Sequence, residues 1–376
     1  MESLVDRVAH TIEARNLATV DCAVLLMVSG GSDSTALAYI ASELAKSGKI
    51  GDLAMLHVNH QLRGEASDGD QEFVQRIADL LQIPLYICEI DVAGEAKRTG
   101  GNVEAIARHE RYLAANEALA GFCRHLALPI SSARIFTAHT QDDRVENFYM
   151  RSIVGTGPGG FRSMLYANGP IVRPCLDIGR EELRDYLQKR VDAKLPVVCD
   201  EDDNLWRDDA TNAHTDRFRA FVRHEIVPLA KQRNPQLLDT LCRTMNLIAD
   251  EDDMLTAKAS KLVSDCATWF AKEGTSIDYG AGCTLKPQFG RVELPLQRRA
   301  TVEVLQCMLG PDARIETSSV DGVTSGFADG APISGYTNNI QGDLALSANK
   351  FGLRIEPMAA YRARRKKVDL HKTNEQ

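Results

Sequence analysis

Short apolar segments alternate with segments of helical spacing through the first half of the chain. The apolar segments are AVLLMV at 23–28, LAMLHV at 53–58, LYICEI at 85–90 and RIFTAH at 134–139. Each is hydrophobic on both faces, which is typical of strands in a parallel sheet covered on both sides by helices. The intervening stretches are long enough for crossover helices, so the pattern predicts an α/β domain with a doubly wound parallel sheet.

The pattern becomes helical near residues 205–215, where we place a domain boundary. Beyond about residue 330 the chain is rich in Gly, Asn and Ser, with a candidate strand pair in GDLALSANKFGLRIEP. We therefore expect an α/β domain at 1–212, a helical domain at 213–330, and an extension at 331–376 that carries the basic cluster RARRKK at 362–367.

Composition limits the partners and the compartment. The net charge is −8, so bulk charge would not hold the protein on nucleic acid, and an RNA partner must meet a local basic patch. The nine cysteines are scattered and never spaced as C-x-x-C, which favours reduced thiols over disulfides or zinc. No apolar run approaches the roughly 18 residues of a membrane span, and the N-terminus lacks a secretory signal. We expect a cytoplasmic protein with no membrane partner.

Three polar motifs follow predicted strands, namely VSGGSDST, HVNH and TAHTQDD. Ligands of doubly wound sheets bind beyond the carboxyl ends of the strands, so these motifs should converge. In VSGGSDST a glycine pair brings backbone N–H groups to a helix N-terminus, which suits a phosphate. The loop lacks the lysine of a Walker motif and is not G-x-G-x-x-G. The alternative is a Gly-Gly turn in which Ser or Asp caps the helix.

The hexapeptide S-G-G-x-D-S resembles the PP-loop of the N-type ATP pyrophosphatases, which cleave ATP between its α and β phosphates. The resemblance implies that ATP and Mg²⁺ are used, that Asp33 lies near the magnesium, and that the pyrophosphate is held by Ser29, Gly30, Gly31, Ser32, Asp33 and Ser34.

Further motifs resemble the tRNA(Ile)-lysidine synthase family, in the same order along the chain. They are HVNHQLR at 57–63, NVEAIAR at 102–108 with Arg111, TAHTQDDRVE at 137–146, Arg151 with Gly155–Gly157, RPCLD at 173–177, and DATN at 209–212 running to Arg219 and Arg223. The chain departs from the family pattern at Thr140, Asn147 and Ala220, and CDEDDNL before WRDDATN looks like an insertion.

This resemblance implies an enzyme that joins free L-lysine to C2 of the wobble cytidine in the CAU anticodon of tRNA(Ile). ATP is converted to AMP and pyrophosphate through an adenylated tRNA, and the modified anticodon reads AUA instead of AUG. A homodimer is compatible with the sequence, which does not define the oligomeric state.

The resemblance also implies roles for particular side chains. Catalytic roles fall to Asp33, Asp143, Glu146 and Arg219. Nucleotide contacts beyond the loop fall to His57 and His60, and lysine contacts to Asp142, Asp143 and Glu146. The tRNA contacts fall to Arg63, Arg108, Arg111 and Arg223.

Structural alternatives remain open for several of these residues. The histidines could be half-buried at a strand end, Arg108 could pair with Glu104 four residues earlier, and Arg219 and Arg223 could be solvated. The acids could cap the first turn of a helix predicted over 141–153, and Gly155–Gly157 could be a helix C-terminal turn.

Two functional alternatives also remain. A tRNA-thiolating enzyme uses the same loop but generally needs paired cysteines, which this chain lacks. The other alternative is a non-catalytic RNA- or nucleotide-binding module of the same fold, against which the intact Asp33 and the acidic trio argue.

Overall fold

The computed structural model describes residues 2–61, 64–207, 218–270, 278–311 and 313–373. The chain forms two compact units, residues 1–248 and 249–376, and the boundary falls within the long helix α10 (Leu237–Cys266). The domain limits at residues 212 and 330, which rest on the change to a helical pattern and on a shift in composition, stay predictions.

The first unit is built on a six-stranded sheet in the order β3-β2-β1-β4-β6-β5. The strands are β1 (Ala23–Met27), β2 (Leu53–Asn59), β3 (Leu85–Glu89), β4 (Ala133–Phe136), β5 (Ala167–Asn168) and β6 (Ile171–Val172). All neighbours pair in parallel except β5, which is antiparallel to β6. The predicted doubly wound sheet is confirmed.

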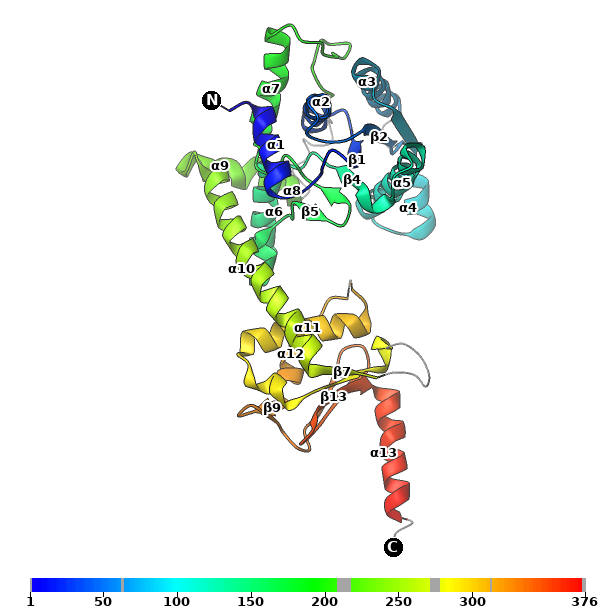
Figure 1. Cartoon of the computed structure of the whole chain (residues 1–376), viewed down its shortest axis with the longest axis vertical. Helices are drawn as coiled ribbons and strands as arrows, with labels where there is room; N and C mark the ends of the chain where they lie inside the picture. The colour runs from blue at the N-terminus through cyan, green and yellow to red at the C-terminus, as the bar shows by residue number, and fades with distance from the viewer. Residues whose placement is uncertain (1, 62–63, 208–217, 271–277, 312, 374–376) are drawn as a thin grey trace. The chain divides into compact units, whose positions relative to one another are not determined.

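Helices cover both faces of this sheet (Figure 1). They are α1 (Leu4–Ala14), α2 (Ser32–Lys46), α3 (Glu65–Leu81), α4 (Val92–Thr99), α5 (Val103–Leu126) and α7 (Arg180–Asp192). Alternate residues of β1 serve opposite layers: Val24 and Leu26 pack in the core that includes α1, α2, α3 and α7, whereas Ala23 and Leu25 pack against α5. This two-sided burial is why the strand reads as continuously apolar.

Strand β3 departs from the prediction of burial on both faces. It is the edge strand of the sheet, and Ile87 on it is 42% exposed. An edge strand has a neighbour on one side only, which the apolar run LYICEI did not reveal.

Helix α6 (Gln141–Val154) follows β4 and confirms the helix predicted over 141–153. Residue Val145 of α6 packs with Val222 and Met245 in a separate apolar cluster. This cluster holds α6 against a continuous helical segment made of α8 (Phe218–Phe221), a π-helical turn (Val222–Ile226) and α9 (Val227–Arg233).

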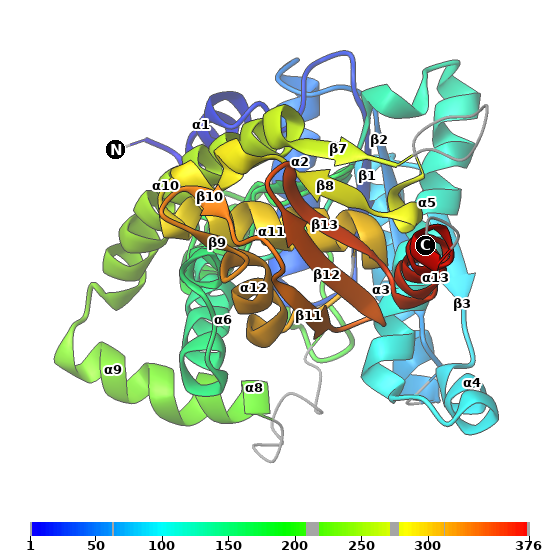
Figure 2. The ribbon, with the colours of Figure 1, turned by 90° about the horizontal axis from the view of Figure 1, so that it is seen from below.

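The second unit contains a five-stranded antiparallel sheet in the order β11-β12-β13-β8-β7, with helices packed against it (Figure 2). Its elements are β7 (Ala267–Trp269), β8 (Cys283–Leu285), α11 (Leu294–Leu309), α12 (Thr317–Thr324), β9 (Phe327–Ala328), β10 (Ala331–Pro332), β11 (Thr337–Ile340), β12 (Leu344–Asn349), β13 (Gly352–Pro357) and α13 (Met358–Thr373). The predicted strand pair is confirmed as β12 and β13. Strands β7 and β8 were missed, because three residues are too few to show an alternation.

Candidate active site

The loop VSGGSDST connects β1 to α2. Gly30 has a φ of +92°, a conformation that residues with a Cβ rarely adopt, and Gly31 is the N-cap of α2. No side chain caps this helix, so the alternative in which Ser or Asp supplies the cap is not observed. The loop is braced from within, because the Ser34 hydroxyl donates to the carbonyl of Gly31 at 3.1 Å. The N-terminal N–H groups of α2, at the positive end of the helix dipole, are therefore available to bind an anion.

Arg207 supports the loop from outside. Its backbone N–H donates to the carbonyl of Gly30 at 2.9 Å, and its guanidinium binds Asp70 of α3 at 3.2 Å and Glu201 at 3.1 Å. The acidic stretch CDEDDNL, predicted to be an insertion, forms a turn in which Asp200 accepts from the backbone N–H of Asn204 at 2.8 Å. This stretch thus leads the chain back to the PP-loop, a role that no sequence motif indicated.

The acidic trio lies at the N-terminus of α6. Asp143 forms a capping box with Thr140: the backbone N–H of Thr140 donates to Asp143 Oδ2 at 2.8 Å. The predicted capping role is therefore real, but it occupies only one oxygen of Asp143. The other oxygen, Oδ1, and both oxygens of the buried Glu146 face a group of arginines.

Arg219 and Arg223 reach these acids from α8 and the π-helical turn. Arg219 Nη2 lies 2.7 Å from Asp143 Oδ1, and its Nε lies 2.9 Å from Glu146 Oε2. Arg223 Nε lies 2.6 Å from Glu146 Oε1. The alternative that both arginines are solvated is wrong, because the packing of Val222 against α6 directs them toward the trio.

Arg180 joins the acids to the PP-loop. Its Nε lies 3.1 Å from Asp33 Oδ2, its Nη2 lies 3.1 Å from Asp143 Oδ1, and its Nη1 lies 3.5 Å from Glu146 Oε1. The backbone N–H of Arg180 also donates to Asp142 Oδ2 at 2.8 Å, while Lys231 binds Asp142 Oδ1 at 3.2 Å.

Neither Arg180 nor Lys231 was predicted from the sequence to belong to the site. One signal was available for Arg180, which lies three residues beyond the motif RPCLD in the first turn of α7. A cation is unfavourable at the positive end of a helix unless nearby acids hold it there.

Burial tends to raise the pKa values of two carboxylates in the site, whereas the neighbouring positive charges lower them. Burial raises the pKa of Asp33, and the facing Arg180 only partly offsets this effect. Burial also tends to raise the pKa of Asp143. The positive charges of Arg180 and Arg219 outweigh this effect and hold the pKa of that carboxyl below its usual range. Asp143 is therefore ionised at neutral pH.

The histidines of the site are neutral at pH 7. Burial, together with Arg111, lowers the pKa of His60 to about 4, and burial lowers that of His139 to about 4. The ring of His57 is buried, and its Nδ1 lies 2.9 Å from the carbonyl of Val28 at the start of the PP-loop. His57 thus contacts the loop backbone, and the predicted nucleotide contacts of His57 and His60 stay predictions.

The predicted tRNA-binding arginines fall in different places. Arg108 and Arg111 are exposed on α5, where Arg111 Nη2 lies 3.2 Å from His60 Nε2 and Arg108 lies over the ring of Tyr112. Arg63 and the motif DATN at 209–212 lie outside the described residues, as does the side chain of Glu104.

The glycine loop and Asn147, one of the departures from the family pattern, have local explanations. Gly155 ends α6 with a φ of +89°, and its N–H donates to the carbonyl of Arg151 at 2.9 Å, so it is a helix C-terminal turn. Asn147 accepts from the Nε of Arg151 at 2.8 Å.

The acidic run Asp250–Asp253 lies within helix α10.

Neither a metal cluster nor a cysteine pair is found in the described part of the chain. No group of three or more His, Cys, Asp or Glu side chains there is placed to hold a metal ion. All nine cysteines are free thiols. Among the same residues, no helix is long and apolar enough to cross a membrane.

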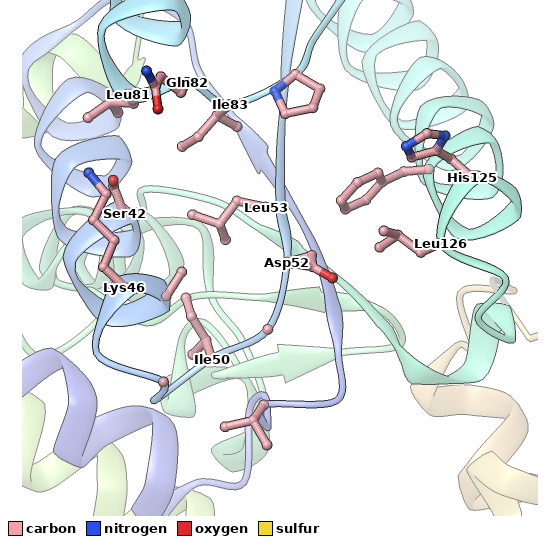
Figure 3. Close-up of a pocket in the computed structure, with 16 residues that line it drawn as sticks. Ser42, Lys46, Ile50, Asp52, Leu53, Leu81, Gln82, Ile83, His125 and Leu126 are labelled. Atoms are coloured by element: carbon pink, nitrogen blue, oxygen red, sulfur yellow. The ribbon is translucent and has the colours of Figure 1, made fainter.

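A surface hollow elsewhere on the first unit is unrelated to these residues. It is lined by Ser42 and Lys46 of α2, by Asp52 and Leu53 at the start of β2, and by His125 of α5 (Figure 3). These positions are at the amino ends of the strands, whereas the PP-loop and the acidic trio follow the carboxyl ends. It is not the site predicted by the motifs.

The phosphate-type loop follows the carboxyl end of β1 in a doubly wound sheet, as predicted from the sequence. The family model described as a PP-loop domain, whose name marks it as ATP-binding, matches residues 4–230. The chain belongs to this family.

Among curated proteins the chain is similar to several tRNA(Ile)-lysidine synthases. The one from Thermotoga maritima is 34% identical over 224 residues, 60% of this chain and 49% of that protein. The one from Thermus thermophilus is 34% identical over 64% of this chain and 42% of its own length. The one from Geobacter sulfurreducens is 31% identical over 80% of this chain and 58% of its own length. The chain spans about half the length of these relatives.

Among solved structures, a U34-tRNA thiolase from Methanococcus maripaludis overlays on 65% of this chain and 78% of its own, with 17% identity and a TM-score of 0.46. This likeness is too weak to bear on the function.

Proposed function

We propose that the protein is a ligase that modifies tRNA: it joins L-lysine to C2 of the wobble cytidine of tRNA(Ile), with ATP converted to AMP and pyrophosphate. The similarity to curated tRNA(Ile)-lysidine synthases supports this proposal. The observation that carries it is the contact of one guanidinium, that of Arg180, with both Asp33 of the PP-loop and the acids of α6. ATP on the loop and the amine of lysine at the acids would then lie close enough to react, one after the other, with the same cytosine base.

The first step activates the base. The O2 atom of the cytosine attacks the α-phosphorus of ATP, the bond between the α-phosphorus and the bridging oxygen breaks, and pyrophosphate leaves. The uncapped N-terminus of α2 is suited to hold the leaving pyrophosphate, because backbone N–H groups donate to phosphate oxygen atoms. The hydroxyls of Ser32 and Ser34 donate to Asp33 Oδ1 at 3.0 Å and to the Gly31 carbonyl at 3.1 Å, so they would have to change acceptors to bind the phosphate. Arg180 is close enough to the loop to share this charge.

Asp33 fits a magnesium ion that phosphate oxygen atoms would also bind. Burial raises its pKa despite the facing Arg180, so a further cation there would favour its anionic form, and Mg²⁺ usually takes one or two carboxylates plus phosphates. Bound there, the ion would neutralise charge on the phosphates. Asp33 itself would orient the polyphosphate through that ion.

The second step uses the adenylated base. The ε-amino group of lysine attacks C2, the C2–O bond breaks, and AMP leaves with its oxygen atom. Because the pKa of Asp143 is held low, this carboxylate is a poor base and suits the binding of the substrate's ammonium groups. Asp143 and Glu146 would therefore position lysine, with Asp142 at their margin, and water would take the proton of the attacking amine.

The tRNA would contact the exposed arginines of α5, Arg108 and Arg111. Arg223 was predicted to bind tRNA as well, but its guanidinium is engaged with Glu146 at 2.6 Å. We assign Arg223, with Arg219, to holding the acid pair.

The decisive experiment is incubation of the protein with ATP, L-lysine and unmodified tRNA(Ile), followed by mass analysis of the nucleosides. We expect cytidine to gain the mass of lysine minus water, only when all three substrates are present. Incorporation of sulfur would favour a thiolating enzyme. Absence of any product, with no release of labelled pyrophosphate, would favour a non-catalytic RNA- or nucleotide-binding module.

A further inference from the structure

The acids predicted to bind lysine already have cationic partners. Asp143 Oδ1 is shared by Arg180 and Arg219, at 3.1 and 2.7 Å, and its Oδ2 is used in the helix cap. Both oxygens of Glu146 contact Arg223, at 2.6 and 3.1 Å. A lysine ammonium that pairs with these carboxylates must therefore displace a guanidinium, at least in part.

The charges of the site also balance. Among the described residues, its ion pairs join four carboxylates to four cationic side chains. The carboxylates are those of Asp33, Asp142, Asp143 and Glu146, and the cations those of Arg180, Arg219, Arg223 and Lys231. Adding a lysine cation to a neutral, largely buried cluster is unfavourable unless an anion arrives or a cation moves.

Arg180 is the cation placed to move. Its contacts with Asp143 and Glu146, at 3.1 and 3.5 Å, are longer than those of Arg219, at 2.7 and 2.9 Å. Of the arginines bound to the acid pair in the described structure, Arg180 is also the one in contact with the PP-loop, through Asp33. Its backbone is anchored to Asp142, so the side chain can change partners without a movement of α7.

We propose that Arg180 couples the nucleotide and lysine sites, by exchanging its guanidinium between the carboxylates of Asp143 and Glu146 and the phosphate oxygen atoms of ATP. Guanidinium groups bind phosphate with two parallel hydrogen bonds, so a polyphosphate on the PP-loop competes well for Arg180. Its transfer releases acceptor oxygen atoms and negative charge at the acid pair. ATP thus strengthens lysine binding, and lysine strengthens ATP binding by the same factor.

This inference rests on the proposed function and concerns a positioning residue. The test is equilibrium dialysis of labelled L-lysine against the full chain, with and without a non-hydrolysable ATP analogue and Mg²⁺. For the unchanged protein we expect the analogue to lower the Kd for lysine about fivefold or more. In Arg180→Gln we expect tight lysine binding without nucleotide and a ratio of Kd values near one. Arg180→Lys, which keeps the charge but loses the two-point contact, should recover part of the ratio.

Lys189→Gln is the matched control, because it removes a positive charge from an exposed position of the same helix. It should retain the full ratio. A merely structural role for Arg180 would weaken lysine binding and leave the ratio unchanged, and that result would overturn the proposal. So would a lysine affinity that is independent of nucleotide in the unchanged protein.

If Arg180→Gln does not fold, the ratio measured for Arg180→Lys decides in the same way. The two proposals fail separately. Lysidine formation with nucleotide-independent lysine binding rejects the coupling by Arg180 and keeps the enzyme activity. Coupled binding of lysine and nucleotide without lysidine formation rejects the enzyme activity and keeps the coupling by Arg180.

Discussion

Arg180 and Asp33 are 147 residues apart in the chain, yet Arg180 Nε lies 3.1 Å from Asp33 Oδ2. The contact links the first turn of α7 to the first turn of α2, two helices that pack on the same face of the sheet. It brings the phosphate-type loop and the acids of α6 into one charged cluster.

Asp33→Asn should lower the rate of tRNA adenylation by orders of magnitude. The substitution removes the negative charge that would orient magnesium and pyrophosphate, while it retains the size of the side chain. Labelled pyrophosphate release measures the rate, and gel-shift titration should show nearly unchanged tRNA binding. Normal turnover in this variant would remove the PP-loop from the mechanism.

Glu146→Gln should weaken the use of lysine at least tenfold. Removing one acid from a buried charge pair costs roughly 2–5 kcal/mol, and about 1.4 kcal/mol corresponds to a factor of ten. Adenylation of tRNA should survive, because the PP-loop is untouched. The measurements are the lysine dependence of product formation and the trapping of AMP-bearing tRNA.

Glu181→Gln provides the control for that variant. Glu181 is an acid on α7 whose side chain is 77% exposed, so its loss should change neither quantity. Melting curves of both variants separate loss of the lysine site from loss of the fold. An unaltered lysine dependence in Glu146→Gln would exclude Glu146 from lysine binding.

Gly30→Ala should destabilise the first unit, and Gly31→Ala should do so much less. The φ of +92° at Gly30 is strained for alanine by about 1–3 kcal/mol, whereas Gly31 has an ordinary φ of −71°. A Cβ on Gly31 would meet no atom closer than 3.7 Å. Urea unfolding of the two variants compares the effects, and equal stabilities would show that the loop relaxes.

The basic cluster of α13 gives a prediction about salt. Arg364 is anchored to the buried Glu356 at 2.6 Å, whereas Arg362, Arg365 and Lys366 are exposed. If these three side chains bind tRNA phosphates, replacing them together with glutamine flattens the dependence of log Kd on log salt. Each lost contact reduces the slope by roughly 0.7–0.9. Deletion of residues 358–376, which removes further basic residues as well, should flatten it at least as much. An unchanged slope would show that the cluster is solvated and does not bind tRNA.

The sequence by itself determined the doubly wound sheet, the PP-loop and the acids of α6. Period and burial are local properties, so the apolar segments that became β1, β2 and β4 were recognisable without tertiary information. The spacing of Asp142, Asp143 and Glu146 likewise placed them at the start of one helix, as observed. The five-stranded sheet of the second unit was largely missed, because β7, β8 and β11 are too short to show an alternation and because β8 pairs with β13, a strand far along the chain.

Only the tertiary structure decided which cations meet the acids. Arg180, Arg219 and Arg223 come from two helical segments whose positions depend on packing against the sheet and against α6. A charged residue in a sequence carries no mark of its partner, because Coulomb attraction depends on distance in space and not on separation along the chain. The supporting contact of Arg207 with Gly30 was hidden for the same reason, since it joins a backbone N–H to a carbonyl, groups that nearly every residue has.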